Sequence, residues 1–228
     1  MPSMRLYYMT SFDTATRFIL PEKRMRISQF DRLNDPFELM SVRMEGKHER
    51  FVFKLLREHW VKNLGVICMG THWKSPLMWG HYADNHKGVC LGFDVADVWP
   101  KKMNYEPDRL QHLIKIGEPV GGLTPEAIEQ VLTTKYQHWA YEEEWRLFLN
   151  LKDKDPINGE YYIAVGSELV LREIILGARC KAPVGSFRKL VGRIDHSVTI
   201  IKARPAFESF TMVRQKAIPA IVVRPCGK

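Results

Sequence analysis

The chain has 228 residues, a formal net charge of +8 and a sequence pI near 9.3. Hydrophobic residues make up 45% and charged residues 26%, the balance of an ordinary globular protein. No apolar run approaches the roughly 20 residues that a transmembrane helix needs, so the composition argues against a membrane protein. The positive charge favours anionic partners such as nucleotides or nucleic acid, and the sequence leaves the oligomeric state open.

The N-terminus and the cysteines indicate the cellular compartment of the protein. The first ten residues, MPSMRLYYMT, contain neither an apolar signal region nor a cleavage site. The four cysteines show no CxxC spacing, and Cys68 and Cys90 lie in apolar runs where a reduced cysteine packs as a small hydrophobic residue. We therefore expect a cytoplasmic protein.

The periodicity of apolar residues predicts short strands and helices that alternate along the chain. The expected strands cover residues 5–9, 25–30, 66–71, 89–93, 102–105, 147–149, 161–165, 173–176, 199–203 and 207–213. The expected helices run from Ser11 or Asp13 to a stop at Pro21, and over residues 49–64, 77–83, 124–136 and 185–191. With no repeats or linkers, this predicts one α+β domain, residues 1–228, whose mixed or mainly antiparallel sheet is flanked by helices.

Residues 33–38, LNDPFE, have the composition of a tight turn. The short side chains of Asn34 and Asp35 bond to nearby backbone, and Pro36 keeps Asp35 out of the helical region. Apolar neighbours would hold this turn against the core. It is either a plain surface turn or a loop that presents Asn34 and Asp35 to a ligand.

The clearest helix, residues 49–64, carries an apolar stripe at helical spacing, formed by Phe51, Leu55, Leu56, His59, Trp60 and Leu64. The strand at 66–71 follows it. This strand and the one at 89–93 are joined through a single short helix, so they are either antiparallel neighbours or a small crossover.

A compact polar cluster in residues 77–94, LMWGHYADNHKGVCLGFD, leads into an apolar strand. Ser75 is a suitable N-cap for the short helix, and a tight turn at 85–88 precedes the strand. The side chains that would gather beside the end of the sheet are Trp79, His81, Tyr82 and His86. Such a place favours a ligand pocket without specifying a reaction.

The strongest chemical signal is the run Glu142-Glu143-Glu144-Trp145-Arg146 at the entry to a strand. Alternate residues of a strand share a face, so Glu142, Glu144 and Arg146 would project together. Two neighbouring carboxylates raise one pKa, which the guanidinium partly offsets, and such a set stabilises a cationic transition state or binds a sugar hydroxyl. The alternative is an exposed acidic helix end with an ordinary Glu–Arg ion pair.

Several other chemistries lack their sequence signatures. The histidines and cysteines between positions 68 and 90 match no standard zinc spacing, so we expect no metal site. There is no GxSxG motif, no Walker lysine and no GxGxxG loop. Aromatic residues near lysine and histidine suit base stacking, but no nucleic-acid-binding motif accompanies them.

Three stretches together, at 33–38, 77–94 and 139–146, resemble the bacterial domain-of-unknown-function family 2971 (DUF2971). The resemblance extends from the first strand to about residue 180. The layout is similar to a remote relative of the ADP-ribosyltransferase fold, in which an early strand, a Tyr or Ser, and a late Glu surround NAD. This implies an NAD-using ADP-ribosyltransferase that modifies nucleic acid or protein, of the bacterial toxin or phage-defence type.

The resemblance also implies residue roles. Glu144 would be the catalytic glutamate and Glu142 the first member of an E-x-E pair. The NAD-binding side chains would come from earlier in the chain: Tyr82 supported by His81 beside the nicotinamide, and Tyr7 or Tyr8 on the first strand, where the fold usually has Arg or His. Two alternatives stand beside this enzyme: a non-catalytic module that binds a nucleotide or nucleic acid, and a structural partner protein.

Overall fold

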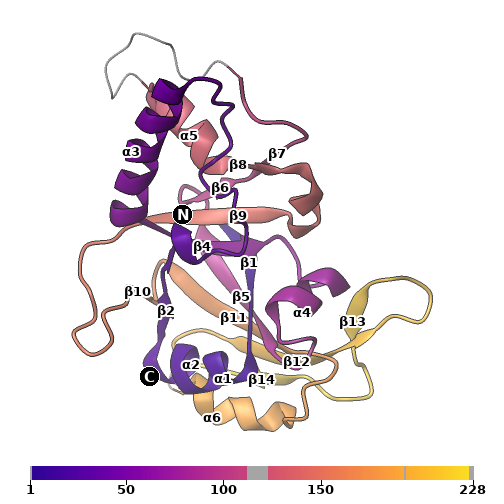
Figure 1. Cartoon of the computed structure of the whole chain (residues 1–228). Coiled ribbons are helices and arrows are strands. Elements are labelled where there is room, and N and C mark those ends of the chain that lie inside the picture. Colours follow the sequence, from indigo (N-terminus) through magenta and orange to yellow (C-terminus); the bar gives the residue numbers. More distant parts are fainter. Residues whose placement is uncertain (1, 112–122, 193, 226–228) are drawn as a thin grey trace. The chain divides into compact units, whose positions relative to one another are not determined.

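A computed structural model describes residues 2–111, 123–192 and 194–225, and these form two compact units (Figure 1). The first unit contains Met1–Met25, Met69–Trp99 and Tyr162–Lys228, and the second Arg26–Cys68 and Pro100–Tyr161. The α+β class with a mainly antiparallel sheet is confirmed. A single-domain organisation stays a prediction. No helix in the described ranges has the length and apolar character needed to cross a membrane.

The first unit is built on a sheet with the strand order β13-β12-β11-β5-β1. Its strands are β1 (Ser3–Thr10), β5 (Val89–Ala96), β11 (Leu169–Leu176), β12 (Val198–Pro205), β13 (Met212–Arg214) and β14 (Ile221–Val223), which pairs with β12. All neighbours are antiparallel except β11 and β12. Two further short strands, β2 (Arg24–Arg26) and β10 (Tyr162–Ala164), pair with each other.

The chain crosses over between β4 (Leu64–Gly70) and β5. Strand β4 begins in the second unit and ends in the first, where Gly70 pairs with Tyr7 of β1. Both β4 and β5 are antiparallel to β1, which lies between them. Of the two predicted arrangements, the crossover is therefore confirmed.

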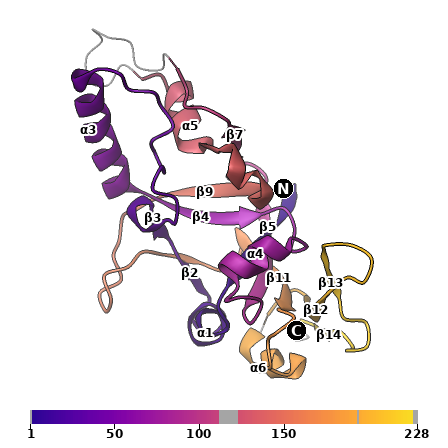
Figure 2. The ribbon, with the colours of Figure 1, turned by 45° about the vertical axis from the view of Figure 1, so that its right-hand side comes forward.

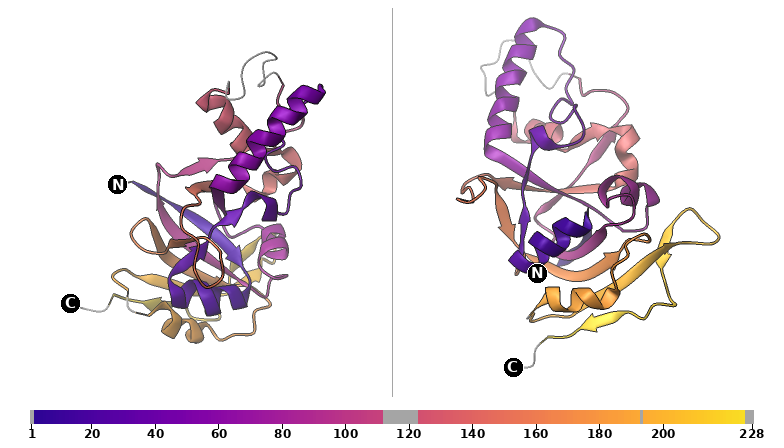
Figure 3. Two further views of the ribbon diagram at one scale, coloured as in Figure 1. Left: turned by 60° about the vertical axis from the view of Figure 1, so that its left-hand side comes forward. Right: turned by 60° about the horizontal axis from the view of Figure 1, so that its bottom comes forward.

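Short helices accompany the sheet of the first unit. They are α1 (Phe12–Thr14), the π-helical η1 (Ala15–Ile19), α2 (Leu20–Glu22), α4 (Pro76–Tyr82), η4 (Val184–Ser186) and α6 (Phe187–Val191). The first three form one stretch, which Ser11 caps as predicted by accepting a hydrogen bond from Thr14 N–H. The predicted stop at Pro21 is wrong by two residues, because Lys23 in the left-handed region ends the helix. Figure 3 shows this stretch beside α6, where the rings of Phe12 and Phe187 meet edge to face.

The second unit has the strand order β4-β9-β6, with β3 also paired to β4 and a separate parallel pair β7/β8. Its strands are β3 (Ser28–Gln29), β6 (Pro100–Lys102), β7 (Asn104–Glu106), β8 (Thr134–Tyr136) and β9 (Glu144–Asn150). Its helices are η2 (Phe30–Arg32), α3 (Lys47–Asn63), α5 (Pro125–Thr133) and the 3-10 helix η3 (Gln137–Glu142). The helix predicted over 124–136 thus ends at Thr133, and its last turn is instead strand β8.

The predicted apolar stripe of α3 is partly wrong. Phe53 and Trp60 are buried, and Leu56 packs against the same cluster, whereas Phe51 and Leu55 are exposed. Positions 53, 56 and 60 are spaced so that they share one face of the helix, and this face packs against the core. Residues 51 and 55 lie on a different face. This cluster includes Val131 of α5, and Figure 2 shows the two helices side by side.

Candidate functional site

Five charged side chains of the second unit form one buried network. Lys135 lies on β8, Glu142 at the end of η3, and Glu144 and Arg146 on β9. The fifth member, Glu38, lies in the turn segment after η2. All five side chains are at most 5% exposed. The alternative interpretation of this run, an exposed acidic helix end, is therefore wrong.

Lys135 joins the two glutamates that the sequence singled out. Its Nζ donates to Glu142 Oε2 at 2.6 Å and to Glu144 Oε2 at 3.2 Å, and it lies 4.8 Å from the centre of the Trp139 ring. The prediction that Glu142 shares a strand face with Glu144 is wrong. Glu142 ends η3 and Glu143 takes a left-handed conformation, so the strand begins only at Glu144.

Arg146 carries the network towards the turn at 33–38. Its Nε and Nη2 donate to Glu144 at 2.7 and 3.1 Å. Its Nη1 and Nη2 donate to the two carboxylate oxygens of Glu38 at 2.8 and 2.5 Å. A guanidinium held in this two-pronged way has a fixed orientation, so Arg146 ties β9 to the segment after the turn.

The network changes the protonation of its members. Burial raises the pKa of Glu144, but the charges of Arg146 and Lys135 outweigh it, and the pKa falls to about 2. Burial lowers the pKa of Lys135, yet Glu144 and Glu142 raise it above its usual value. The expected rise of a glutamate pKa is therefore wrong for Glu144, because two cations rather than one face it.

Two further groups contact Glu144. Its backbone N–H donates to Tyr105 Oη at 2.8 Å, and burial raises the pKa of that phenol to about 12. The Cys68 thiol lies beside its carboxylate, and burial with this negative charge holds the thiol pKa well above its usual value. Glu144 is thus a fully engaged carboxylate that is ionised at neutral pH.

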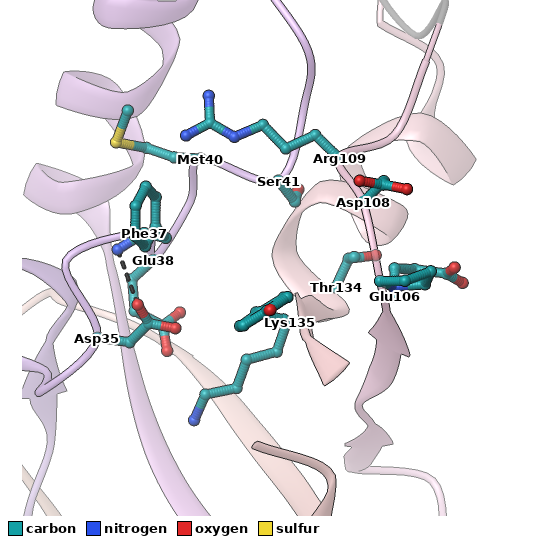
Figure 4. A pocket seen from close by; sticks show the side chains of 12 residues that line it. Asp35, Phe37, Glu38, Met40, Ser41, Glu106, Asp108, Arg109, Thr134 and Lys135 are labelled. Atoms are coloured by element: carbon teal, nitrogen blue, oxygen red, sulfur yellow. Dashed lines mark hydrogen bonds between the residues drawn. The ribbon is translucent and has the colours of Figure 1, made fainter. Parts of the chain in front are cut away.

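A pocket of about 310 Å³ lies next to the network (Figure 4). Glu38 and Lys135 belong both to the network and to the pocket wall, whereas Glu142, Glu144 and Arg146 do not line it. The remaining lining residues are Asp35, Phe37, Met40, Ser41, Glu106, Pro107, Asp108, Arg109, Thr134 and Tyr136. Four carboxylates and two cations therefore surround a space with aromatic groups at its rim, in a chain that is basic as a whole.

Asp35 is the pocket carboxylate that stands outside the network. It is 5% exposed, and one oxygen accepts a hydrogen bond from Phe37 N–H at 2.9 Å, the turn geometry predicted for this stretch (Figure 4). Among the described residues it forms no ion pair. Asn34, the other candidate of the turn, is exposed and does not line the pocket.

The other sequence candidates belong to the first unit. Trp79 is fully buried, and its indole N–H donates to the Trp73 carbonyl at 2.6 Å, so it is part of the core. Tyr82 and Tyr7 are half-buried against the same core. Of the remaining three, His81 is exposed, whereas Tyr8 and His86 are half-buried.

The surroundings of Tyr7 and His86 shift the pKa values of these two side chains in opposite directions. Burial, followed by the negative charge of Glu173, raises the pKa of Tyr7 to about 12. Burial and then Arg179 lower the pKa of His86. His86 also lies in a run of three left-handed residues, and its ring stacks on Trp79 at 6.5 Å between centres. The turn predicted at 85–88 is therefore present and tightly packed.

Sequence reasoning missed Lys135 and did not assign a role to Glu38. Lys135 lay inside a predicted helix, and only its place on β8 brings it to the carboxylates. Glu38 closes the LNDPFE stretch, and that position was the available signal.

The chain was compared with known families, curated proteins and solved structures. No curated protein and no solved structure matches it significantly. A family model matches residues 78–147, which contain most of α4, all of β5 and α5, and four members of the buried network: Lys135, Glu142, Glu144 and Arg146. Over these residues the chain is similar to the family described as proteins of unknown function, DUF2971.

Proposed function

We propose that the pocket of the second unit binds NAD and that the protein is an NAD-using enzyme of the ADP-ribosyltransferase type. The observation that carries the proposal is Asp35, a buried carboxylate on the pocket wall that forms no ion pair with any residue the structure describes. A carboxylate in such a place is available to the positive charge that develops on a ribose when its bond to nicotinamide breaks.

The charge balance of the pocket supports a ligand with a cationic part. Its four carboxylates attract positive charge, and the nicotinamide ring of NAD carries one. At the rim, Phe37 and Tyr136 are exposed aromatic groups suited to stacking on a flat ring. Arg109, whose guanidinium lies 5.3 Å from the Phe37 ring centre, suits a pyrophosphate.

In this proposal the reaction breaks the bond between ribose C1′ and the nicotinamide nitrogen. The electron pair of that bond leaves with nicotinamide, which becomes neutral, and Asp35 stabilises the cationic sugar until an acceptor attacks C1′. Glu142 and Glu144 act as positioning residues because both hold Lys135, and Glu144 also holds Arg146, which in turn fixes Glu38. This replaces the direct catalytic role that the resemblance implies for Glu144.

NAD and NADH provide a matched pair of ligands, because they have nearly the same size but only NAD has a cationic ring. We expect NAD to raise the melting temperature of the protein more than NADH at equal concentration. We also expect release of nicotinamide, measured by chromatography, when NAD is incubated with the protein and candidate acceptors.

Asp35→Asn keeps the size of the side chain and the acceptor oxygen for Phe37 N–H, so the variant should fold. Nicotinamide release should fall at least about 100-fold, the usual effect of losing one charge-stabilising group. Asp31→Asn, an exposed neighbour outside the pocket, is the control and should be unchanged. Equal shifts with NAD and NADH, or full activity of Asp35→Asn, would contradict the proposal.

A further inference from the structure

The loop between β12 and β13 presents two phenylalanines to solvent. Residues 206–211 connect the strands, and within them Phe207 is 91% and Phe210 102% exposed. Figures 1 and 3 both show this hairpin projecting from the body of the first unit. Two such large apolar side chains on one short loop are unusual unless something covers them.

The loop is held in place by its backbone. Ala206 N–H donates to the Thr211 carbonyl at 2.8 Å, which closes the loop. Met212 N–H donates to the Lys74 carbonyl at 2.8 Å, and Thr211 Oγ1 donates to the same oxygen at 3.2 Å. Met212 itself is buried in the core of the first unit. The exposure of the two rings is therefore fixed by the fold.

Basic residues flank the hairpin on its strands and beside it. The guanidinium of Arg204 lies 4.2 Å from the centre of the Phe207 ring, which leaves the other face of that ring available. Arg214 is exposed on β13, where it pairs with Ala203, and Lys74 is exposed beside the hairpin. Glu208 is the one acidic residue in the sequence from 198 to 225.

We propose that this hairpin binds single-stranded nucleic acid. Exposed aromatic rings stack on bases of any sequence, and the neighbouring guanidinium and ammonium groups neutralise phosphates. The charge of the chain, +8, has the matching sign. The site belongs to the first unit and does not depend on NAD binding in the second.

The tip of the loop argues against insertion into a membrane. Glu208 and Ser209 lie between the two phenylalanines and are exposed. Placing both rings in the hydrocarbon region would draw the Glu208 carboxylate out of water, at a large cost in free energy. Stacking on bases leaves Glu208 in water.

Fluorescence anisotropy with a labelled oligo(dT) of about 16 nucleotides tests the site on the full chain. The affinity should fall as salt rises. Phe207→Ala and Phe210→Ala should each weaken binding about tenfold or more, the effect of losing one stacking ring. Arg214→Gln should weaken binding and reduce the slope of log affinity against log salt by about 1.

Phe18→Ala is the matched control, since Phe18 is an exposed phenylalanine of the same unit outside the hairpin. Its affinity should equal that of the unmodified protein. Both hairpin rings are exposed, so their variants should keep the melting temperature of the parent. Vesicles of anionic and neutral lipid form the second arm. Binding to vesicles without binding to oligo(dT), or equal losses in Phe18→Ala and the hairpin variants, would overturn the proposal.

Discussion

Replacing Lys135 with methionine removes the ammonium group between two buried carboxylates and keeps a side chain of similar length. The Nζ lies 2.6 Å from Glu142 Oε2 and 3.2 Å from Glu144 Oε2, and all three side chains are at most 4% exposed. Glu142 and Glu144 would then keep their negative charges in a poorly hydrated place. We expect a loss of about 3–5 kcal/mol in the free energy of unfolding, the usual result of removing one partner from a buried ion pair.

The depressed pKa of Glu144 reflects the same interactions. A value of about 2 against an ordinary 4.5 corresponds to roughly 3 kcal/mol of preferential stabilisation of the ionised form. Arg146 provides part of this and Lys135 part, since both charges act on the carboxylate. Lys135→Met also removes the shorter hydrogen bond, the one to Glu142. The expected loss in the free energy of unfolding therefore stays at about 3–5 kcal/mol.

Urea unfolding followed by tryptophan fluorescence would measure the loss. Lys101→Met is the matched control, because Lys101 Nζ lies 2.9 Å from Glu129 Oε1 in the same unit but on the surface. That exposed pair should contribute less than about 1 kcal/mol. A double variant with Glu142→Gln should recover part of the loss, as a double-mutant cycle would show. Equal small effects of Lys135→Met and Lys101→Met would refute the reasoning.

Three further predictions concern stability. Because the folded-state pKa of Glu144 is depressed, its contribution should be complete above pH 4.5 and lost as pH falls towards 2, as acid titration of the melting temperature would show. Gly177→Ala should destabilise strongly because a Cβ would overlap the His86 carbonyl, whereas Gly80→Ala in α4 meets nothing and should be neutral or stabilising in thermal melts. Phe53→Ala should cost about 3–5 kcal/mol in urea unfolding, and Phe51→Ala, on the exposed side of α3, less than about 0.5.

Local patterns predicted many elements of the fold correctly. Ser75 and Thr124 cap α4 and α5 as expected, because a side-chain oxygen before a proline at the first helical position is a strong local signal. The apolar runs at 66–71 and 89–93 predicted buried strands, and the structure has strands at Leu64–Gly70 and Val89–Ala96. Such signals depend on residues within a few positions of each other, so they can be recognised without knowledge of the tertiary structure.

Predictions failed where distant contacts decide the conformation. Residues 134–136 continue a helical pattern, but their pairing with β7 makes them a strand and brings Lys135 to the network. Glu38 and Arg146 are 108 positions apart, and no local pattern indicates their ion pair. The helix face of α3 was misjudged because Phe51 and Phe53 are equally apolar, and only the position of the core separates them.

The overlap of network and pocket determines which variants can test function. Lys135 and Glu38 line the pocket and also balance buried charges, so a substitution at either position alters binding and stability together. A loss of activity in Glu144→Gln is equally ambiguous, because this substitution weakens the ion pairs of Glu144 with both Lys135 and Arg146. Asp35 differs because it lines the pocket without an ion pair among the described residues. If Asp35→Asn loses nicotinamide release while its melting temperature is kept, the carboxylate acts on the ligand; if both fall together, its role is to hold the turn.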